Sequence, residues 1–534
     1  MPTNRSGTTV RVATLEAMRG LEIRVIFGNP GSTEVPFLLD LPKDIDFVMG
    51  LHEGAVVGMA TSYALATGRP AFVSLHTAAG LGNAVNAIAN ARDCHAPLVI
   101  VVGQQDRKQL HLNPFLSGRS LERIAGEYPV WTNLPARAQD VPGAIARAYH
   151  EAKAGAGPAI VVVPMGDWQE TCDLIGAGAP ERVLYPAEVG QDQLNPLVEL
   201  LATATSPVIV TGAGTDSPAG FAAATALAER LGCPVWHEPF SGRAGFPEDH
   251  PQFAGHLDWH RAAIRASLEP HDLVLVLGTK AFQLYILDED KPPVRADTRV
   301  VVISSNAEDV HRSDCALALV GPVAPICKAL AARVPQREHT TGSPLRRPEA
   351  PPAGHPLRGG QVLQLLADLL PRDAVVMEEA PSHRDELLAR IPTRTALGFC
   401  SSPNGGLGFG LAGAIGLRMA MPDRPVVAVV GDGAAMFGIQ AIWSAVTYNI
   451  GVLFIVMANG RYGVMDGQAA ARGATPPWPR FPGLEIAALA RAMGCSAVRV
   501  DTFDEMTGII KRAVPDLRAL REPLLVEVTL RDEA

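Results

Sequence analysis

Short apolar runs alternate with amphipathic stretches along most of the chain. The clearest runs are rich in β-branched residues, as expected for parallel strands that are covered on both faces. They lie at 25–27, 71–74, 97–102, 159–163, 207–210, 273–277, 300–303 and, most distinctly, within 425–433 and 451–460. Strands that alternate with helical stretches indicate βαβ units. The pattern predicts an α/β protein built from doubly wound parallel sheets.

Polar segments rich in proline or glycine divide these runs into three blocks. We predict domains at 1–180, 190–335 and 358–534, and the 534 residues suffice for three domains of ordinary size. The stretch 174–190 is interpreted as a connector. The clearest linker is 335–358, which has many prolines and no apolar periodicity.

Composition narrows the class of protein. The net charge of −9, without a basic run, argues against a nucleic-acid partner. Seven scattered cysteines without CxxC spacing favour a reducing compartment over a disulfide framework or a zinc site. The first residues lack the apolar core of a signal peptide, and no run reaches the roughly 18 apolar residues of a membrane span. We therefore expect a cytoplasmic protein without a membrane partner.

Polar side chains follow the two most distinct apolar runs. Asp432 comes directly after the first run, and Asn459 ends the second, about one βαβ unit later. Ligands of open parallel sheets bind beyond the carboxyl ends of the strands. A carboxylate and an amide oxygen at that edge suit a small hard cation such as Mg²⁺, which also takes phosphate oxygens. Gly433 would let the backbone approach a phosphate group.

Several motifs together resemble a known family. The segment 431–433 (GDG) with Asn459 resembles the thiamine-diphosphate motif. The segments 27–37 (FGNPGSTEVPF), 51–58 (LHEGAVVG) and 74–84 (SLHTAAGLGNA) resemble the N-terminal domain of the pyruvate decarboxylase and acetolactate synthase superfamily. Within that superfamily the similarity is greatest to the benzoylformate decarboxylases, and it runs over essentially the whole chain.

This resemblance implies an architecture and an activity. The three domains would be pyrimidine-binding, middle and diphosphate-binding, with thiamine diphosphate and Mg²⁺, or Ca²⁺ in its place, as cofactors. The implied reaction is non-oxidative decarboxylation of a small 2-oxo acid to an aldehyde and CO₂. One alternative is a carboligase or C–C lyase that forms or cleaves 2-hydroxy ketones. Another is a protein that binds the cofactor without catalysis.

The middle block contains Gly212-Ala-Gly214 after an apolar run, which by itself could indicate a dinucleotide fold. A complete GxGxxG motif is missing, so a structural turn is the favoured interpretation. Some synthases of the superfamily carry FAD in this domain, but we expect none here. The resemblance also implies a homodimer or homotetramer with active sites at the subunit interface.

The resemblance assigns cofactor roles to individual residues. Glu53 would activate the cofactor's aminopyrimidine ring. Asp432, the side chain of Asn459 and the backbone carbonyl of Arg461 would hold the metal. The other implied cofactor contacts are Asn29, Pro30, Gly31, Ser382, Gly405, Leu407, Gly431, Gly433, Ala434 and Tyr462.

Three further residues are implied to act on the substrate. Ser32 would bind the carboxylate, and His76, which follows an apolar run, would move protons near neutral pH. Benzoylformate decarboxylases carry a second histidine where this chain has Tyr285. A tyrosine, with a pKa of about 10, is a poorer proton shuttle. This departure is the reason for keeping the carboligase alternative.

Overall fold

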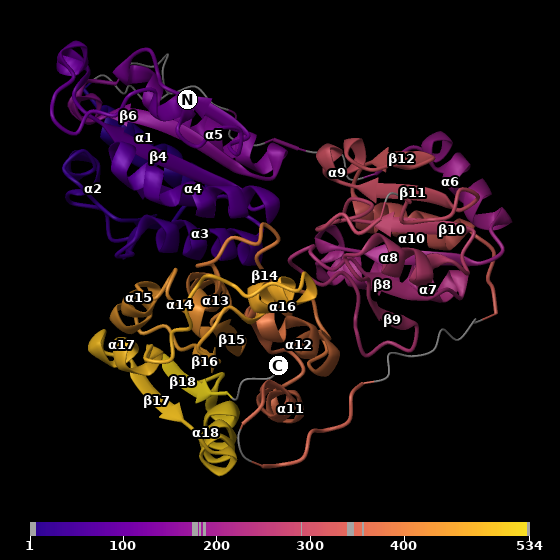
Figure 1. Ribbon diagram of the computed structural model, residues 1–534. Helices are drawn as coiled ribbons and strands as arrows, with labels where there is room; N and C mark the ends of the chain where they lie inside the picture. Colours follow the sequence, from indigo (N-terminus) through magenta and orange to yellow (C-terminus); the bar gives the residue numbers. More distant parts are fainter. Residues whose placement is uncertain are drawn as a thin grey trace.

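The computed structural model describes residues 7–172, 180, 183–184, 188–289, 291–338, 347–354 and 357–530. Within these residues the chain forms three six-stranded sheets, and the strands of each sheet pair in parallel. Helices cover the sheets on both faces (Figure 1). The predicted α/β class with three doubly wound parallel sheets is confirmed.

The first sheet has the strand order β2-β1-β3-β4-β6-β5. Its strands are β1 (Val25–Gly28), β2 (Asp46–Met49), β3 (Ala71–Leu75), β4 (Leu98–Gln104), β5 (Trp131–Asn133) and β6 (Pro158–Pro164). Its helices are α1 (Val10–Gly20), α2 (Val35–Leu38), α3 (Glu53–Thr67), α4 (Thr77–Asp93) and α5 (Val141–Gly155). The predicted apolar runs correspond to β1, β3, β4 and β6. The strands β2 and β5 are only partly buried and carry no such run.

The second sheet has the order β12-β11-β10-β7-β8-β9. Its strands are β7 (Pro207–Thr211), β8 (Val235–His237), β9 (Phe253–His256), β10 (Leu273–Leu277), β11 (Arg299–Ser304) and β12 (Leu317–Val320). Its helices are α6 (Gln191–Thr203), α7 (Pro218–Leu231), α8 (Arg261–Leu268), α9 (Ala307–His311) and α10 (Val323–Arg333). The segment from Gly212 to Gly214 forms the predicted turn after β7, and the Gly214 N–H donates to the carbonyl of Gly278 at 2.7 Å. A Cβ at Gly214 would lie 2.6 Å from the Cα of Gly278, so this close approach requires glycine.

The third sheet has the order β14-β13-β15-β16-β18-β17. Its strands are β13 (Val375–Glu379), β14 (Phe399–Ser401), β15 (Val426–Gly431), β16 (Leu453–Ala458), β17 (Ser496–Val500) and β18 (Leu524–Thr529). Its helices are α11 (Gly359–Leu369), α12 (Arg384–Arg390), α13 (Gly410–Ala420), α14 (Asp432–Ala435), α15 (Ala441–Thr447), α16 (Gly463–Ala471), α17 (Ile486–Ala492) and α18 (Phe503–Asp516). The two most distinct apolar runs of the sequence are the neighbouring strands β15 and β16.

The first and third sheets share one apolar core. Helices α3 and α13 pack directly against each other because glycines on both helices leave room. A Cβ at Gly58 would lie 2.9 Å from that of Ala412, and one at Gly416 would collide with the backbone carbonyl of Met59. This contact fixes the start of α3, where Glu53 lies, relative to the third sheet.

The two predicted connecting segments are only partly described. Most of 174–190 lies outside the described residues, as do 339–346 and 355–356 of the predicted linker. The described linker residues 335–338 and 347–354 form neither helix nor strand. Over the part of the chain that is described, none of the helices is both long enough and apolar enough to span a membrane.

Candidate active site

Glu53 is the first residue of α3, and its carboxylate is held by two side-chain amides. His52 caps the helix by accepting the Gly54 N–H at 3.1 Å. The Asn29 side chain donates to Oε1 of Glu53 and the Asn83 side chain to Oε2, each at 3.0 Å. The glutamate is only 7% exposed. Asn29, predicted as a cofactor contact, therefore orients Glu53, and Asn83 is a partner that the sequence analysis missed.

His76 lies at the end of β3 and contacts the turn that precedes α2. Its Nδ1 is 3.0 Å from Oε2 of Glu34 and 2.9 Å from the Thr33 hydroxyl. Glu34 is 3% exposed and also accepts the Gly31 N–H at 2.8 Å. A carboxylate only accepts hydrogen bonds, so this geometry places a proton on Nδ1 of His76 and leaves Nε2 as the exchangeable nitrogen.

The turn at 29–34 brings several predicted residues to His76. Gly31 approaches the imidazole ring so closely that any Cβ there would collide with it. Pro30 and Ser32 are exposed on the same turn. Thr33 and Glu34, which orient the histidine, were not singled out from the sequence, although they directly follow Ser32.

Asp432 and Asn459 lie side by side beyond the ends of β15 and β16, as predicted. The two carboxylate oxygens of Asp432 accept the N–H groups of Gly433 at 2.8 Å and Gly460 at 2.7 Å. Burial raises the pKa of Asp432, and these amides oppose the rise. The Asn459 Oδ1 accepts the Arg461 N–H at 3.2 Å. Each oxygen has lone pairs left for a hard cation, so the donor set fits Mg²⁺ or Ca²⁺.

Further predicted cofactor contacts surround this pair. A Cβ at Gly433 would lie 2.7 Å from the Tyr462 ring, so the glycine packs beneath the tyrosine. A Cβ at Gly463 would lie 2.8 Å from the Ser382 hydroxyl and 3.5 Å from the Asn459 amide nitrogen. Gly431 and Ala434 flank the carboxylate at the start of α14, and Ala434 is buried. The exposed Ser382 provides an aliphatic hydroxyl in this cluster, where Ala434 offers none.

The loop with Gly405 and Leu407 belongs to the third domain and contacts the first domain. Gly405 has a φ of 75°, in the left-handed region that favours glycine. The carbonyl of Leu407 accepts a hydrogen bond from the Asn86 side chain at 3.3 Å. Asn86 and Asn83 are one helical turn apart on α4, so this helix connects the loop with Glu53.

Glu379, at the end of β13, anchors the same loop and was not predicted. Its carboxylate accepts the N–H groups of Gly408, Phe409 and Gly410 at 2.8, 2.9 and 3.0 Å. Burial raises the pKa of Glu379 to about 8, against the effect of these amides. The carboxyl group thus fixes the start of α13 and the segment that follows Leu407.

We expect Glu379→Gln to reduce the pH dependence of stability between about pH 5 and about pH 8. In this window the folded chain keeps a proton on Glu379 that the unfolded chain, with a pKa of about 4.3, has lost. The wild-type free energy of unfolding should therefore fall as the pH rises, and glutamine cannot release this proton. Urea unfolding across the window measures the slope. Burial also raises the pKa of Glu238 to about 8, so Glu238→Gln is the matched variant with which the slope of Glu379→Gln is compared. An unchanged slope in Glu379→Gln would contradict the assignment.

Tyr285 lies apart from both clusters. Its side chain is on the surface of the middle domain, with the residue 60% exposed. The ring packs against Trp259 at 5.3 Å and Phe240 at 6.2 Å between centroids. Among the described residues, these ring contacts lie within the middle domain.

Comparisons with known proteins match all three parts of the chain. Three family models of the thiamine pyrophosphate (TPP, or thiamine diphosphate) enzymes match the chain. The N-terminal TPP binding domain matches residues 8–122, the central domain 194–330 and the C-terminal TPP binding domain 386–528. The benzoylformate decarboxylase of Pseudomonas aeruginosa is 36% identical, over 97% of this chain and 98% of that protein.

Solved structures give the same result. A thiamine diphosphate-dependent 4-hydroxybenzoylformate decarboxylase from Rhodococcus jostii RHA1 superposes with a TM-score of 0.94 at 35% identity, covering 99% of this chain and 100% of that one. The benzoylformate decarboxylase from Polynucleobacter necessarius has a TM-score of 0.92 at 29% identity, covering 98% and 99%.

Proposed function

The chain belongs to the thiamine pyrophosphate enzymes, and from this premise we propose that it catalyses the non-oxidative decarboxylation of a 2-oxo acid to an aldehyde and CO₂. The proposed substrates are aryl 2-oxo acids of the benzoylformate type. The full-length similarity to benzoylformate decarboxylases carries this proposal. The oriented pair of Glu53 and His76 supports it, because a protein that only binds the cofactor would need neither.

The residues of the site have separate proposed roles. Bound thiamine diphosphate supplies the electron sink of the reaction. The buried carboxylate of Glu53 would hold the pyrimidine ring. Ser32 would bind the substrate carboxylate, and Nε2 of His76 would exchange protons with the reacting substrate.

The metal and the diphosphate group would be held by the third domain. Asp432, Asn459 and the carbonyl of Arg461 would ligate Mg²⁺ or Ca²⁺. The residues proposed to surround the remaining parts of the cofactor are Asn29, Pro30, Gly31, Ser382, Gly405, Leu407, Gly431, Gly433, Ala434 and Tyr462. In this scheme residues 1–180 bind the pyrimidine ring and 358–534 the diphosphate, while 190–335 form the middle domain.

Carboligation is the second candidate function, and the position of Tyr285 favours it. An exposed tyrosine in place of a histidine would make proton delivery slower, and an acceptor aldehyde could then compete with the proton. The product would be a 2-hydroxy ketone instead of a free aldehyde.

A product screen distinguishes the two functions. Purified protein with thiamine diphosphate and Mg²⁺ is incubated with aromatic and aliphatic 2-oxo acids, with and without an acceptor aldehyde, and products are identified by mass spectrometry. We expect free aldehyde from the aromatic acids. Hydroxy ketone as the main product would replace decarboxylation by carboligation, and no turnover of aryl 2-oxo acids would contradict the proposed substrate class.

Tyr285→Phe tests whether the tyrosine hydroxyl takes part. If it donates to the substrate, kcat should fall about 10-fold, the effect of losing one hydrogen bond of about 1–1.5 kcal/mol. The ring contacts with Trp259 and Phe240 remain in this variant, so the packing is preserved. Steady-state kinetics with the best substrate of the screen measures the change. An unchanged kcat would remove Tyr285 from the mechanism.

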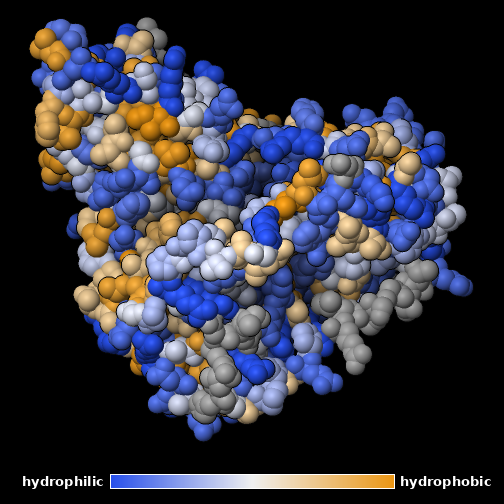
Figure 2. Space-filling view, viewed as in Figure 1, coloured by the Kyte–Doolittle hydropathy of each residue, from blue (hydrophilic) through white to orange (hydrophobic). Residues whose placement is uncertain are grey.

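We also propose that the protein works as a homodimer or homotetramer. Large apolar residues are exposed on the first and third domains, among them Leu112, Phe115 and Phe437, with exposures of 69%, 88% and 56%. Figure 2 shows hydrophobic residues gathered over these two domains, at the left of the view, more than over the middle domain. Large exposed apolar residues of this kind are typical of interfaces. Sedimentation velocity measures the assembly.

A further inference from the structure

We propose that His237, Glu248 and His256 form a binding site for one divalent transition-metal ion, with Zn²⁺ as the expected occupant. The site lies in the middle domain and is separate from the pair Asp432 and Asn459. His237 ends β8 and His256 ends the neighbouring strand β9, and the two are register partners. Glu248 lies in the segment that connects these strands.

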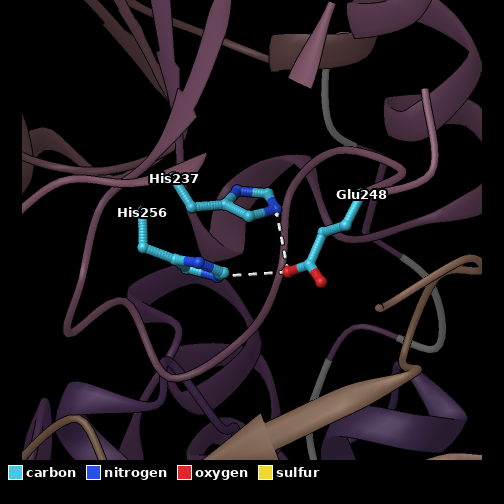
Figure 3. A group of neighbouring side chains, drawn as sticks. All are labelled: His237, Glu248 and His256. Atoms are coloured by element: carbon cyan, nitrogen blue, oxygen red, sulfur yellow. Dashed lines mark hydrogen bonds and ion pairs between the residues drawn. The ribbon is translucent and has the colours of Figure 1, made fainter. Parts of the chain in front are cut away.

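The three side chains converge on one point (Figure 3). The Oε1 of Glu248 lies 3.5 Å from Nε2 of His237 and 3.1 Å from Nε2 of His256, and all three ligand atoms lie within 4.8 Å of one another. Tetrahedral zinc, bound at about 2.0–2.2 Å, places its ligand atoms about 3.4 Å apart. The two separations from Oε1 of Glu248, 3.5 and 3.1 Å, are close to this spacing.

The protonation of His237 favours a cation between the rings and the carboxylate. Its Nδ1 lies 2.9 Å from the Thr211 hydroxyl, and this hydroxyl accepts the Nδ1 proton when it donates to the Trp236 carbonyl at 3.4 Å. In that tautomer Nε2 presents a lone pair toward Glu248. Two acceptors that face each other at 3.5 Å repel unless a cation lies between them.

Burial of the group supports the same inference. The side chains of His237 and Glu248 are 3% and 2% exposed, and within the described chain Nε2 of His237 has no hydrogen-bond partner. A buried polar atom without a partner is costly, and a metal ion would satisfy it. His256 is 18% exposed, so the group is reachable from solvent, and a water molecule would be the fourth ligand.

The ligand set selects the metal. Two imidazoles and one carboxylate suit Zn²⁺ and its neighbours in the first transition series, whereas Mg²⁺ and Ca²⁺ prefer oxygen ligands. The hydrogen bond from His237 to Thr211 is the outer contact that typically orients a metal-bound histidine. The proposed ion would therefore not compete for the oxygen donors of Asp432.

The position of Glu248 gives the ion a structural role. Its second oxygen accepts the N–H of Thr393 at 2.7 Å, and its own N–H donates to the Thr393 carbonyl at 2.8 Å. Thr393 lies between α12 and β14 of the third domain. An ion on Glu248 would thus connect strands β8 and β9 and stabilise the contact between the middle and third domains.

Metal analysis of the full-length, tag-free protein tests the proposal. The protein is loaded with Zn²⁺, dialysed against buffer with Mg²⁺ and analysed by plasma mass spectrometry. We expect one zinc per chain in the wild type and in Asp432→Ala, and none in His237→Ala or His256→Gln. His250, in the same segment but paired with Glu229 at 3.4 Å, supplies the control His250→Ala, which should keep its zinc. Loading with Co²⁺ should give the visible absorption of a tetrahedral site.

Two outcomes would overturn the proposal. One is a wild type that retains no more zinc than the His237→Ala variant, which would make the group a hydrogen-bonded cluster only. The other is loss of zinc in Asp432→Ala with retention in His256→Gln, which would place the ion in the third domain. Circular dichroism of every variant identifies those that fail to fold, and His256→Gln, at the most exposed ligand, keeps the test decisive if His237→Ala does not fold.

Discussion

Glu53→Gln is expected to lower kcat by about 10²–10⁴-fold, the usual contribution of a positioned acid or base. Glutamine keeps the size of the side chain, but it cannot share a proton with the pyrimidine ring. One of the two amide donors, Asn29 or Asn83, would also face the new NH₂ group instead of an acceptor. The variant should therefore bind thiamine diphosphate while exchanging the C2 proton of the cofactor slowly.

Two measurements separate this effect from simple misfolding. Proton exchange at C2, followed by NMR after mixing with deuterated buffer, should slow together with kcat, while the affinity for the cofactor changes little. Glu151→Gln, at a surface residue paired with Arg147, is the matched control and should behave as the wild type. Wild-type rates of C2 exchange in Glu53→Gln would exclude Glu53 as the activating acid.

The sequence predicted those parts of the fold that depend on strongly apolar strands. The strands β15 and β16 are fully or nearly fully buried, and their β-branched runs are distinct. Asp432 and Asn459 could be placed together because the ends of neighbouring parallel strands meet at one edge. The strands β8 and β9 have only a few residues and mixed burial, so no apolar run marks them. The cluster at their ends was missed for the same reason.

Other contacts depend on folding that a sequence pattern does not encode. The contact between Glu34 and His76 joins residues 42 positions apart, through a turn and a strand end. Glu379 ends the buried strand β13, and only its three amide partners identify its role. The active-site role of Tyr285 came from the resemblance alone and stays a prediction; the tyrosine is exposed on the surface of the middle domain.

His76→Ala is expected to lower kcat for decarboxylation by about 10²–10⁴-fold, because it removes the group proposed to exchange protons with the substrate. Glu34→Gln should have a smaller effect, about 10-fold, since it keeps the imidazole but weakens a hydrogen bond worth about 1–1.5 kcal/mol. Glutamine at 34 can also donate to Nδ1 and so favour the other tautomer of His76. The smaller effect is expected for Glu34→Gln because Glu34 acts through its contact with Nδ1 of His76, at 3.0 Å.

The double variant shows whether Glu34 acts through His76. If Glu34 only orients the imidazole, adding Glu34→Gln to His76→Ala should cause no further loss of kcat, because the group that it positions is gone. A further loss of about 10-fold in the double variant would show that Glu34 contributes independently. His311→Ala, at an exposed histidine that ends α9, is the control for loss of an imidazole.

With an acceptor aldehyde present, slower protonation in His76→Ala should raise the share of hydroxy ketone among the products. An unchanged product ratio would place proton delivery on another residue.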